Sequence, residues 1–517
     1  MRRPHAGSVR STPCSARSSS RWPACSSSST DRRSMDVFPQ LSVDRGIPIP
    51  IAEQLTARIR EAVLAGSIAP GEALPASRAL ASAIGVSRTV VVSAYEQLVG
   101  EGFLESRQGA GTRVVPELPR WGEWERRGAD PEQGSVSNGP ASSGSIDLRP
   151  GRPHVAAAPP REFVRAMQEA ARQPWHSDAP DSSGIPALRD ALAAHTRRSR
   201  GIACAAADVS VTSGTSEALL LLALALRAVH GRAPRIAVED PGYAEGIRAF
   251  ERAGAEIVRV PVGADGATAH DLRALSAGQP LDAVLLTPSH QFPLGGRIPA
   301  AERLGILEWA RASETLIIED DYDSEFRHAG ALLPALGSLA PGVATITTLN
   351  KVLSPSIRCA AIVLVAESAA SVALQTELRA VREDVGPPLP LIQQSGLATF
   401  LESGGFRREL ARTRREYGHR RGLLLERLSE LGIPVSGADG GLHVVVPLED
   451  QDGDAVVQEL AAQGVLVDRV GNYRARLTKT QQDALIIGYG AEPATRLLRG
   501  IDVVAAALAA HNSAPRR

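Results

Sequence analysis

From about residue 147 the sequence alternates short apolar runs, rich in β-branched side chains, with stretches of helical pattern. Runs that are apolar throughout are typical of strands buried on both faces. Their alternation with helices favours a mostly parallel sheet covered by helices, which is an α/β fold. The clearest of these runs are Arg235–Glu239, Ala283–Thr287, Leu316–Glu319 and Ala344–Thr348.

The pattern changes again beyond about residue 390. Two long helical segments come first, followed by strand-like runs at Leu442–Pro447 and Val465–Val470 with a helix between them, and a last strand–helix pair. This order predicts a smaller α+β subdomain. We therefore expect one domain over 147–510, with a large part at about 147–388 and a small C-terminal subdomain at about 389–510.

The N-terminal third divides by composition. Residues 1–34 are rich in Arg and Ser with almost no large apolar side chains, which is typical of a disordered tail. A transit peptide and a later start at Met35 both stay open as alternatives. Residues 116–146 contain a Gly, Ser, Asn and Pro stretch that predicts a flexible linker.

Between tail and linker, residues 45–115 predict a small folded unit. Apolar residues recur at helical spacing in a first segment, a second helix ends at Gly85, and Ser87 is a good N-cap for a third. Two short strands then flank a turn that contains Gly109 and Gly111. Three helices followed by a β-ribbon are a winged helix-turn-helix.

The charges of this unit are unevenly placed. The whole chain has 57 basic and 57 acidic residues, so its net charge does not indicate a nucleic-acid partner. However, residues 74–95 contain Arg78 and Arg88 without any acid, and residues 106–115 add Arg107 and Arg113, again without an acid. A basic face of this kind favours phosphate binding, although winged helices also serve as protein-interaction modules.

Two segments of the large domain suggest ligand chemistry. In residues 209–219 a strand leads through Gly214 into an apolar helix, where free N–H groups and the hydroxyls of Thr215 and Ser216 suit a phosphate. Small polar residues also cap many ordinary helices. In residues 316–323 a strand ends in a carboxylate cluster, where Asp320 could keep a pyridine nitrogen protonated. A metal site or a solvated loop is the alternative.

A lysine carries the third signal. The chain has only two lysines, Lys351 and Lys479, and uses Arg for every other basic side chain. Lys351 follows a β-branched strand and precedes Arg358 by seven residues. A lysine can form an imine with an aldehyde and an arginine cannot, so Lys351 is the candidate catalytic residue. A surface lysine retained by chance is the alternative, and Lys479 fits it better.

The N-terminal unit resembles the DNA-binding domain of GntR-type regulators. The resemblance lies in Leu74-Pro75-Ala76-Ser77-Arg78, Gly85-Val86-Ser87-Arg88-Thr89, Ala94-Tyr95-Glu96-Gln97-Leu98 and Glu101-Gly102-Phe103-Leu104. It implies that Arg78, Ser87, Arg88 and Thr89 contact a double-stranded DNA operator and that Gly109 and Gly111 shape the wing.

The large domain resembles the fold-type I aminotransferases, since the three segments occur in the same order and with suitable separations. Two further stretches, 238–243 and 287–293, also resemble this family and make the resemblance more specific. With the GntR-like unit in front, the chain from about 45 to 510 resembles a MocR-type regulator. This implies pyridoxal 5′-phosphate as cofactor, linked to Lys351 as an aldimine. The residues implied around it are Asp320 at the pyridine nitrogen, Tyr322 at the ring hydroxyl, Tyr243 against the ring, Gly214, Thr215, Ser216, Thr348 and Arg358 at the phosphate, and His290 at the ring's other edge.

Some positions depart from the family pattern. Asn350 replaces the Ser usually found before the lysine, and residues 179–184 lack the Tyr that reaches the cofactor phosphate across a dimer. Glu245 stands where some members have an Arg for a substrate carboxylate, a role that Arg474 or Arg476 could fill. The effector is therefore left open.

We expect a cytoplasmic, homodimeric regulator that senses an amine or amino acid through aldimine exchange at Lys351. A working aminotransferase with an accessory DNA-binding domain is the alternative, and a DNA-binding protein with a decayed pocket is a third hypothesis. No apolar run is long enough for a membrane span, and the four Cys form no CxxC pair, so we expect neither membrane insertion nor a metal site.

Overall fold

The computed structural model describes residues 43–44, 49–64, 67–107, 111–116, 144–155, 158–174, 177–328, 334–437, 439–449, 451–475 and 482–513. The predictions made for residues 1–34, for Gly109, for Arg476 and for most of the linker lie outside these residues.

The N-terminal unit contains the elements expected of a winged helix. Its core contains apolar side chains from all three helices together with Phe103. The third helix begins directly after Ser87, whose hydroxyl accepts a hydrogen bond from the Val90 amide, which confirms the predicted N-cap. The elements are α2 (Ile51–Leu64), α3 (Ser77–Ile84), α4 (Arg88–Gly100) and the antiparallel strands β1 (Leu104–Arg107) and β2 (Gly111–Val114).

The large part is built on a seven-stranded sheet with the order β4-β10-β9-β8-β7-β5-β6. Strand β10 runs antiparallel to both of its neighbours, and the other pairs are parallel, so the predicted mostly parallel sheet is confirmed. The strands are β4 (Val209–Thr212), β5 (Arg235–Asp240), β6 (Glu256–Pro261), β7 (Ala283–Leu286), β8 (Leu316–Asp321), β9 (Val343–Thr348) and β10 (Ala360–Leu364).

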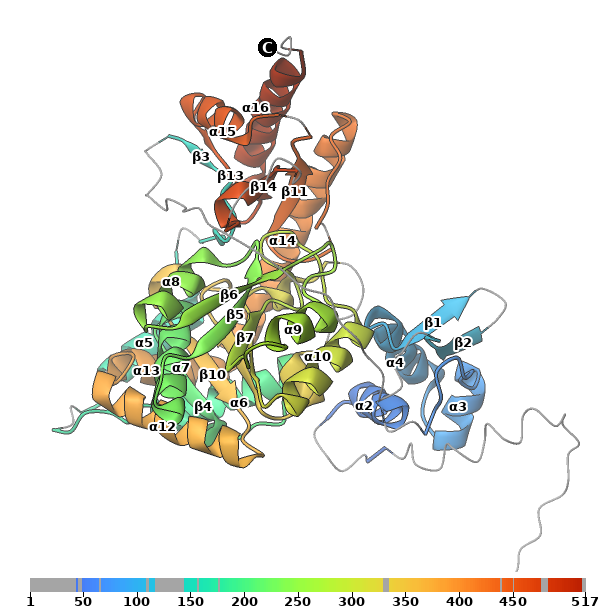
Figure 1. Ribbon diagram of the computed structural model, residues 1–517, viewed down its shortest axis with the longest axis vertical. Coiled ribbons are helices and arrows are strands. Elements are labelled where there is room, and N and C mark those ends of the chain that lie inside the picture. Colours follow the sequence, from blue (N-terminus) through green and yellow to red (C-terminus); the bar gives the residue numbers. More distant parts are fainter. Residues whose placement is uncertain are drawn as a thin grey trace, which may run out of the picture.

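Helices cover both faces of this sheet (Figure 1). One apolar cluster joins one face to α7 (Thr215–His230), α8 (Ala244–Arg252) and α12 (Ala369–Val385). A second cluster joins the opposite face to α9 (Ala269–Ser276), α10 (Ala300–Ala312) and α11 (Leu336–Leu339). The strands are therefore buried on both sides, which explains why their sequences are apolar throughout.

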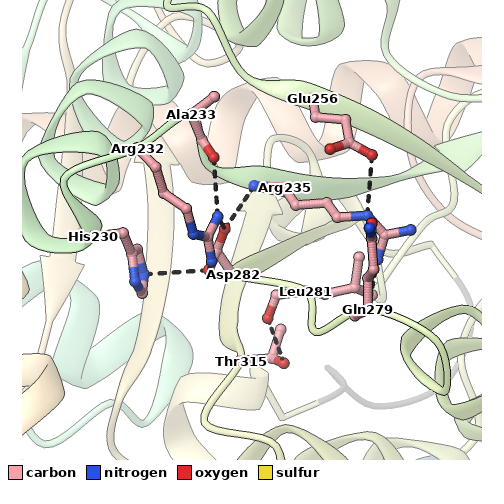
Figure 2. Close-up of polar contacts among 9 residues, drawn as sticks. All are labelled: His230, Arg232, Ala233, Arg235, Glu256, Gln279, Leu281, Asp282 and Thr315. Carbon is pink, nitrogen blue, oxygen red and sulfur yellow. Dashed lines mark hydrogen bonds and ion pairs between the residues drawn. The ribbon is translucent and has the colours of Figure 1, made fainter.

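Polar contacts tie together the end of the sheet at which β5, β7 and β8 begin (Figure 2). The buried carboxylate of Asp282, just before β7, accepts two hydrogen bonds of 2.7 Å from Arg232 and one of 2.7 Å from the Arg235 amide. The hydroxyl of Thr315 donates to the Leu281 carbonyl at 2.9 Å. This end is filled by contacts within the chain, so the opposite, carboxyl ends of the strands are the place to look for a ligand site.

The small subdomain contains a three-stranded sheet of order β11-β14-β13, covered by helices. A two-residue strand near the start of the large domain, β3 (Ile146–Asp147), pairs with β12 of this subdomain. By its pairing this segment belongs to the small unit, although the sequence pattern places 147 at the start of the large part. The elements are α14 (Gly405–Glu430), β11 (His443–Pro447), α15 (Gly453–Ala462), β12 (Val465–Leu466), β13 (Asp468–Arg469), β14 (Ala484–Gly488) and α16 (Ala494–Ser513).

The expected division near residue 388 also differs from the packing. Helix α13 (Leu391–Glu402) packs against α5 (Arg161–Ala171) and α6 (Pro186–Arg200), which belong to the large part. The pattern of apolar residues predicts a helix here but not which of two neighbouring units it joins.

The winged helix lies beside α10 of the large part (Figure 1). Ala300 belongs to the apolar core of the winged helix, and Ala301, Leu304 and Leu339 pack against that core. A Cβ added to Gly102 would lie 3.7 Å from the Ala300 side chain. The winged helix therefore contacts the large part at the first turns of α10.

Candidate cofactor site and nucleic-acid interface

A cavity of about 370 Å³ lies at the carboxyl ends of the strands. Parallel sheets place ligands at this edge, because several loops converge there. Of the ten residues predicted around the cofactor, nine line this cavity: Gly214, Thr215, Ser216, Tyr243, Asp320, Tyr322, Thr348, Lys351 and Arg358.

Lys351 lies in the turn that follows β9. Asn350 holds this turn, because its amide N–H donates to the Thr348 hydroxyl and its side-chain oxygen accepts from the Cys359 amide, both at 3.2 Å. The Lys351 Nζ donates to the Gly151 carbonyl at 2.7 Å. Asn350 thus fixes the loop that carries the amine.

The electrostatic surroundings favour a reactive amine. Burial lowers the pKa of Lys351, while the charges of Asp323 and Asp320 oppose that effect. A lowered pKa increases the fraction of neutral amine, which is the nucleophilic form.

Asp320, near the end of β8, has a carboxylate oxygen without a partner. The side chain is only 6% exposed, and its Oδ1 makes no hydrogen bond to any described residue. Burial, and next the charge of Asp321, raise the pKa of Asp320 to about 7, against the attraction of Lys351. A cationic ring N–H would supply the missing donor and favour the ionised carboxylate.

The start of α7 and Arg358 form a cradle for an anion. Gly214 precedes the helix with φ +137° and provides no side-chain cap, so the first helical N–H groups stay open to a ligand. A Cβ added to Gly214 would lie 3.4 Å from a guanidinium nitrogen of Arg358. The empty space beside glycine therefore lets the guanidinium and the helix start face the same point.

Two tyrosines complete the cavity wall. The hydroxyl of Tyr243 lies 3.4 Å from that of Ser216. The hydroxyl of Tyr322 donates to the His290 carbonyl at 3.1 Å and lies 2.9 Å from His290 Nδ1. His290 itself does not line this cavity. It contacts Tyr322, which does.

Among the lining residues that were not singled out from the sequence are Gly151, Arg152 and Tyr473. The first two lie in a Gly- and Pro-containing segment, 149–153, which signals a turn but not its destination. Tyr473 precedes Arg474, which the sequence suggested for a carboxylate. Contacts between segments this far apart in the chain leave no local pattern.

Glu245 and Arg474 occupy different surroundings. Glu245 lines the cavity and forms an ion pair with Arg248 at 3.2 Å. Arg474 does not line the cavity, and burial lowers its pKa against the charges of Asp240 and Asp483.

The predicted DNA-contacting residues lie on one exposed part of the winged helix. Arg78 belongs to α3, Ser87 caps α4, and Arg88 and Thr89 begin it, and all four are exposed. The Arg88 Nε donates to the Ser77 hydroxyl at 3.3 Å, which links the two helices. Gly111 begins the second wing strand with φ +80°. Base edges are read by residues at such a helix start.

The buried carboxyl of Asp320 leads to a pH prediction for the cofactor-free protein. Because its pKa is raised on folding, ionisation costs stability that accumulates from the unfolded pKa near 4 up to about 7. The carboxamide of the variant Asp320→Asn stays neutral, so the stability of this variant relative to the native chain should grow by about 2–3 kcal/mol between about pH 5 and about pH 8. Thermal unfolding followed by circular dichroism measures this, with the exposed Asp190→Asn as control; a difference that stays constant with pH would contradict the assignment.

Comparison with protein families identifies both parts of the chain. The model of aminotransferase class I and II matches residues 145–484, and the model of bacterial regulatory proteins of the gntR family matches residues 51–114. The two domains therefore define a helix-turn-helix transcriptional regulator that carries an aminotransferase-type domain. This chain belongs to the MocR-type group of GntR-family regulators.

Relatives of known name have the same arrangement over most of their length. The pyridoxine biosynthesis transcriptional regulator PdxR of Corynebacterium glutamicum is 38% identical over 433 residues, covering 82% of this chain and 89% of that protein. The probable rhizopine catabolism regulatory protein MocR of Rhizobium meliloti is 31% identical over 500 residues, covering 92% and 97%. The vitamin B6 salvage pathway transcriptional repressor PtsJ of Salmonella typhimurium is 28% identical over 424 residues, covering 80% and 89%.

Solved structures confirm the fold of the large domain. An archaeal alanine:glyoxylate aminotransferase superposes with a TM-score of 0.63 at 24% identity, covering 71% of this chain and 92% of that one. Kynurenine aminotransferase of Pyrococcus horikoshii has the same TM-score at 20% identity, covering 72% and 93%. At this identity the likeness concerns the fold alone.

In the parts of the chain that the structure describes, no helix is long and apolar enough to cross a membrane. The same described residues include no group of His, Cys, Asp and Glu side chains arranged for a metal ion. Cys204 and Cys359 are both buried and unbridged.

Proposed function

We propose that this regulator binds pyridoxal 5′-phosphate covalently at Lys351 and changes its operator binding when an amine or amino acid competes for that link. When bound, this cofactor supplies an aldehyde that forms imines with primary amines and a ring that withdraws electrons. The observation that carries the proposal is the meeting of three unlike groups in one cavity: the Lys351 amine, the unpartnered Asp320 oxygen and the Arg358 guanidinium beside Gly214.

Each group has a distinct task. Lys351 holds the aldehyde carbon, and Asp320 accepts a hydrogen bond from the ring nitrogen. Arg358, Thr348 and the start of α7 with Gly214, Thr215 and Ser216 bind the phosphate. Tyr243 contacts the ring and Tyr322 the ring hydroxyl, while His290 supports Tyr322 through the 2.9 Å contact between its Nδ1 and the hydroxyl.

Arg152 is our candidate for the carboxylate of an amino-acid effector. It lines the cavity beside Gly151, whose carbonyl holds the lysine amine. Its side chain is 40% exposed and lies 3.9 Å from Asp147, so the guanidinium retains donors for a ligand. Arg152 would then take the role of the Arg that some family members have at the position of Glu245.

For the DNA-binding unit we propose operator contacts by Arg78, Ser87, Arg88 and Thr89, with Gly111 shaping the wing. Their common exposure on α3 and the start of α4 supports this. Operators often consist of two half-sites, which a homodimer can bind at the same time. The proposal therefore includes a homodimer, and it places the protein in the cytoplasm.

The test is operator binding by the cofactor-loaded protein, measured by fluorescence anisotropy with and without a panel of amines and amino acids. At least one compound should change both the visible spectrum and the operator affinity. If compounds change the spectrum but never the affinity, the sensing function is wrong.

A working aminotransferase is the second candidate, favoured by the lowered pKa of Lys351, which suits proton transfer. Steady conversion of an amino acid and a keto acid by the same preparation would select it. The names of PdxR and PtsJ also make pyridoxal 5′-phosphate itself a candidate signal, so the operator is titrated with that compound alone as well.

A further inference from the structure

A second cavity, of about 430 Å³, lies on the far side of His290 from the cofactor cavity. Its walls come from the loop after β7, from the segment around Arg327, and from residues 435–437 and 439–441, which precede β11. The two cavities share no lining residue. The second cavity therefore lies between the large part and the small subdomain and has a size usual for small-molecule sites.

Two buried polar atoms of its wall make no hydrogen bond of good geometry within the part of the chain that the structure describes. His290 is 4% exposed, and its Nε2 makes no hydrogen bond of good geometry to any described residue. The Nε of Arg327 is likewise buried without a partner among the described residues. Buried donors without partners are costly, and a ligand with acceptor atoms would satisfy both.

Two neighbours of the His290 imidazole favour its charged form. Burial opposes a charge on His290, but Asp323 and the Gly437 carbonyl outweigh it and raise the pKa. The Nδ1 lies 2.9 Å from the Asp323 carboxylate. When the ring is charged, its second nitrogen also carries a proton, on the side of the ring away from Asp323.

Two guanidinium groups line the same space. Burial, and next the repulsion by Arg297, lower the pKa of Arg327, while Asp439 opposes them. The acidic side chains of the wall, Asp265 and Asp439, are both exposed, so solvent screens their charge. Arg327 is partly buried, and its repulsion by Arg297 would be relieved by an anion between them.

Glycines bring the two parts of the protein into contact around this space. A Cβ added to Gly295, which has φ +74°, would lie 2.4 Å from the Gly437 Cα. A Cβ on Gly441, with φ +71°, would lie 2.1 Å from the imidazole carbon of His290. Side chains are excluded at these crossings, so the loop before β11 stays against His290 and the cavity keeps its shape.

We propose that this cavity binds a small organic anion, a phosphate or a carboxylate, through Arg297, Arg327 and the Nε2 proton of His290. Cationic donors converging from two loops are suited to such oxygens. An anion here would be bound by the large part and would lie against the wall residues of the small subdomain that precede β11. It would also contact, through His290, the hydroxyl of Tyr322 in the cofactor cavity.

The experiment uses the full-length protein with pyridoxal 5′-phosphate added, titrated separately with inorganic phosphate and with glutarate against chloride of equal ionic strength. Isothermal titration calorimetry should show saturable binding of at least one anion at millimolar concentrations, and the comparison assigns its class. Arg297→Gln with Arg327→Gln should weaken that binding by about tenfold or more. The single variant Arg297→Gln should also weaken the binding. Because Arg297 is exposed, this variant tests the site even if the change at the partly buried Arg327 disturbs folding.

Two control variants make the result specific. Arg252→Gln, an exposed change on α8, should bind the anion like the native chain, and so should Arg358→Gln, which alters the cofactor cradle. The proposal is overturned if neither anion binds, if the double variant binds unchanged, or if Arg358→Gln alone removes binding. The two proposals fail in different ways. The cofactor proposal concerns Arg358, whereas the anion proposal concerns Arg297 and Arg327, so the variants test the two sites separately.

Discussion

Replacement of Lys351 by alanine should abolish the visible absorption that the native protein acquires when pyridoxal 5′-phosphate is added. The absorption comes from conjugation of the ring with a carbon–nitrogen double bond, and alanine has no amine to form it. Lys351 is the amine placed in the cavity beside Asp320 and Arg358. The loss should be complete, because the cavity's other cationic side chains are guanidinium groups, which do not form imines under these conditions.

The chain provides its own matched control for this experiment. Lys479 is the only other lysine, so Lys479→Ala removes the same side chain from a different segment. That variant should absorb like the native protein. An unchanged spectrum in Lys351→Ala, or a lost one in Lys479→Ala, would move the attachment site away from Lys351.

The second large effect is expected at the recognition helix. Arg88→Ala should weaken binding to the specific operator by about 5- to 150-fold, since a good arginine–base contact contributes about 1–3 kcal/mol. The side chain is exposed at the first position of α4, where it can reach a base edge or a phosphate. Electrophoretic mobility shift with the native operator measures the change.

Arg58→Ala is the matched control for Arg88, because Arg58 is an exposed arginine of α2 that pairs with Glu61 at 3.1 Å. We expect it to bind the operator like the native protein. Binding by the native protein should also fall steeply as salt rises, because phosphate contacts release counterions. Equal affinities of the Arg88 and Arg58 variants would show that another surface reads the DNA.

Much of the fold could be predicted because its signals are local. Strands buried on both faces, such as β5 and β8, read as continuous apolar runs, and Ser87 marks a helix start by its own chemistry. The pairing of β3 with β12 could not be predicted, since two residues have no periodicity and their partner lies more than 300 positions along the chain. The packing of α13 on the large part could not be predicted either, because its helices of contact, α5 and α6, lie far from it in the sequence.

The residues of the candidate cofactor site could be predicted where they lie at the end of a strand, directly after a strand, or directly before a helix. Asp320, Lys351 and Gly214 all occupy such positions, and the scarcity of lysine drew attention to one of them. Gly151 and Tyr473 were missed because they reach the cavity only through tertiary packing. Asn350 looked like a departure from the family pattern, but its side chain bonds to the Cys359 amide and holds the lysine turn.

The direct measurement of the central claim is borohydride reduction of the cofactor-loaded native protein, followed by mass spectrometry of its peptides. Reduction converts the link between amine and cofactor into a stable bond, so the modified residue can be read from the fragment masses. We predict a single phosphopyridoxyl group on Lys351. A modification found on Lys479 or on the chain's N-terminal amine, with Lys351 unmodified, would contradict the account.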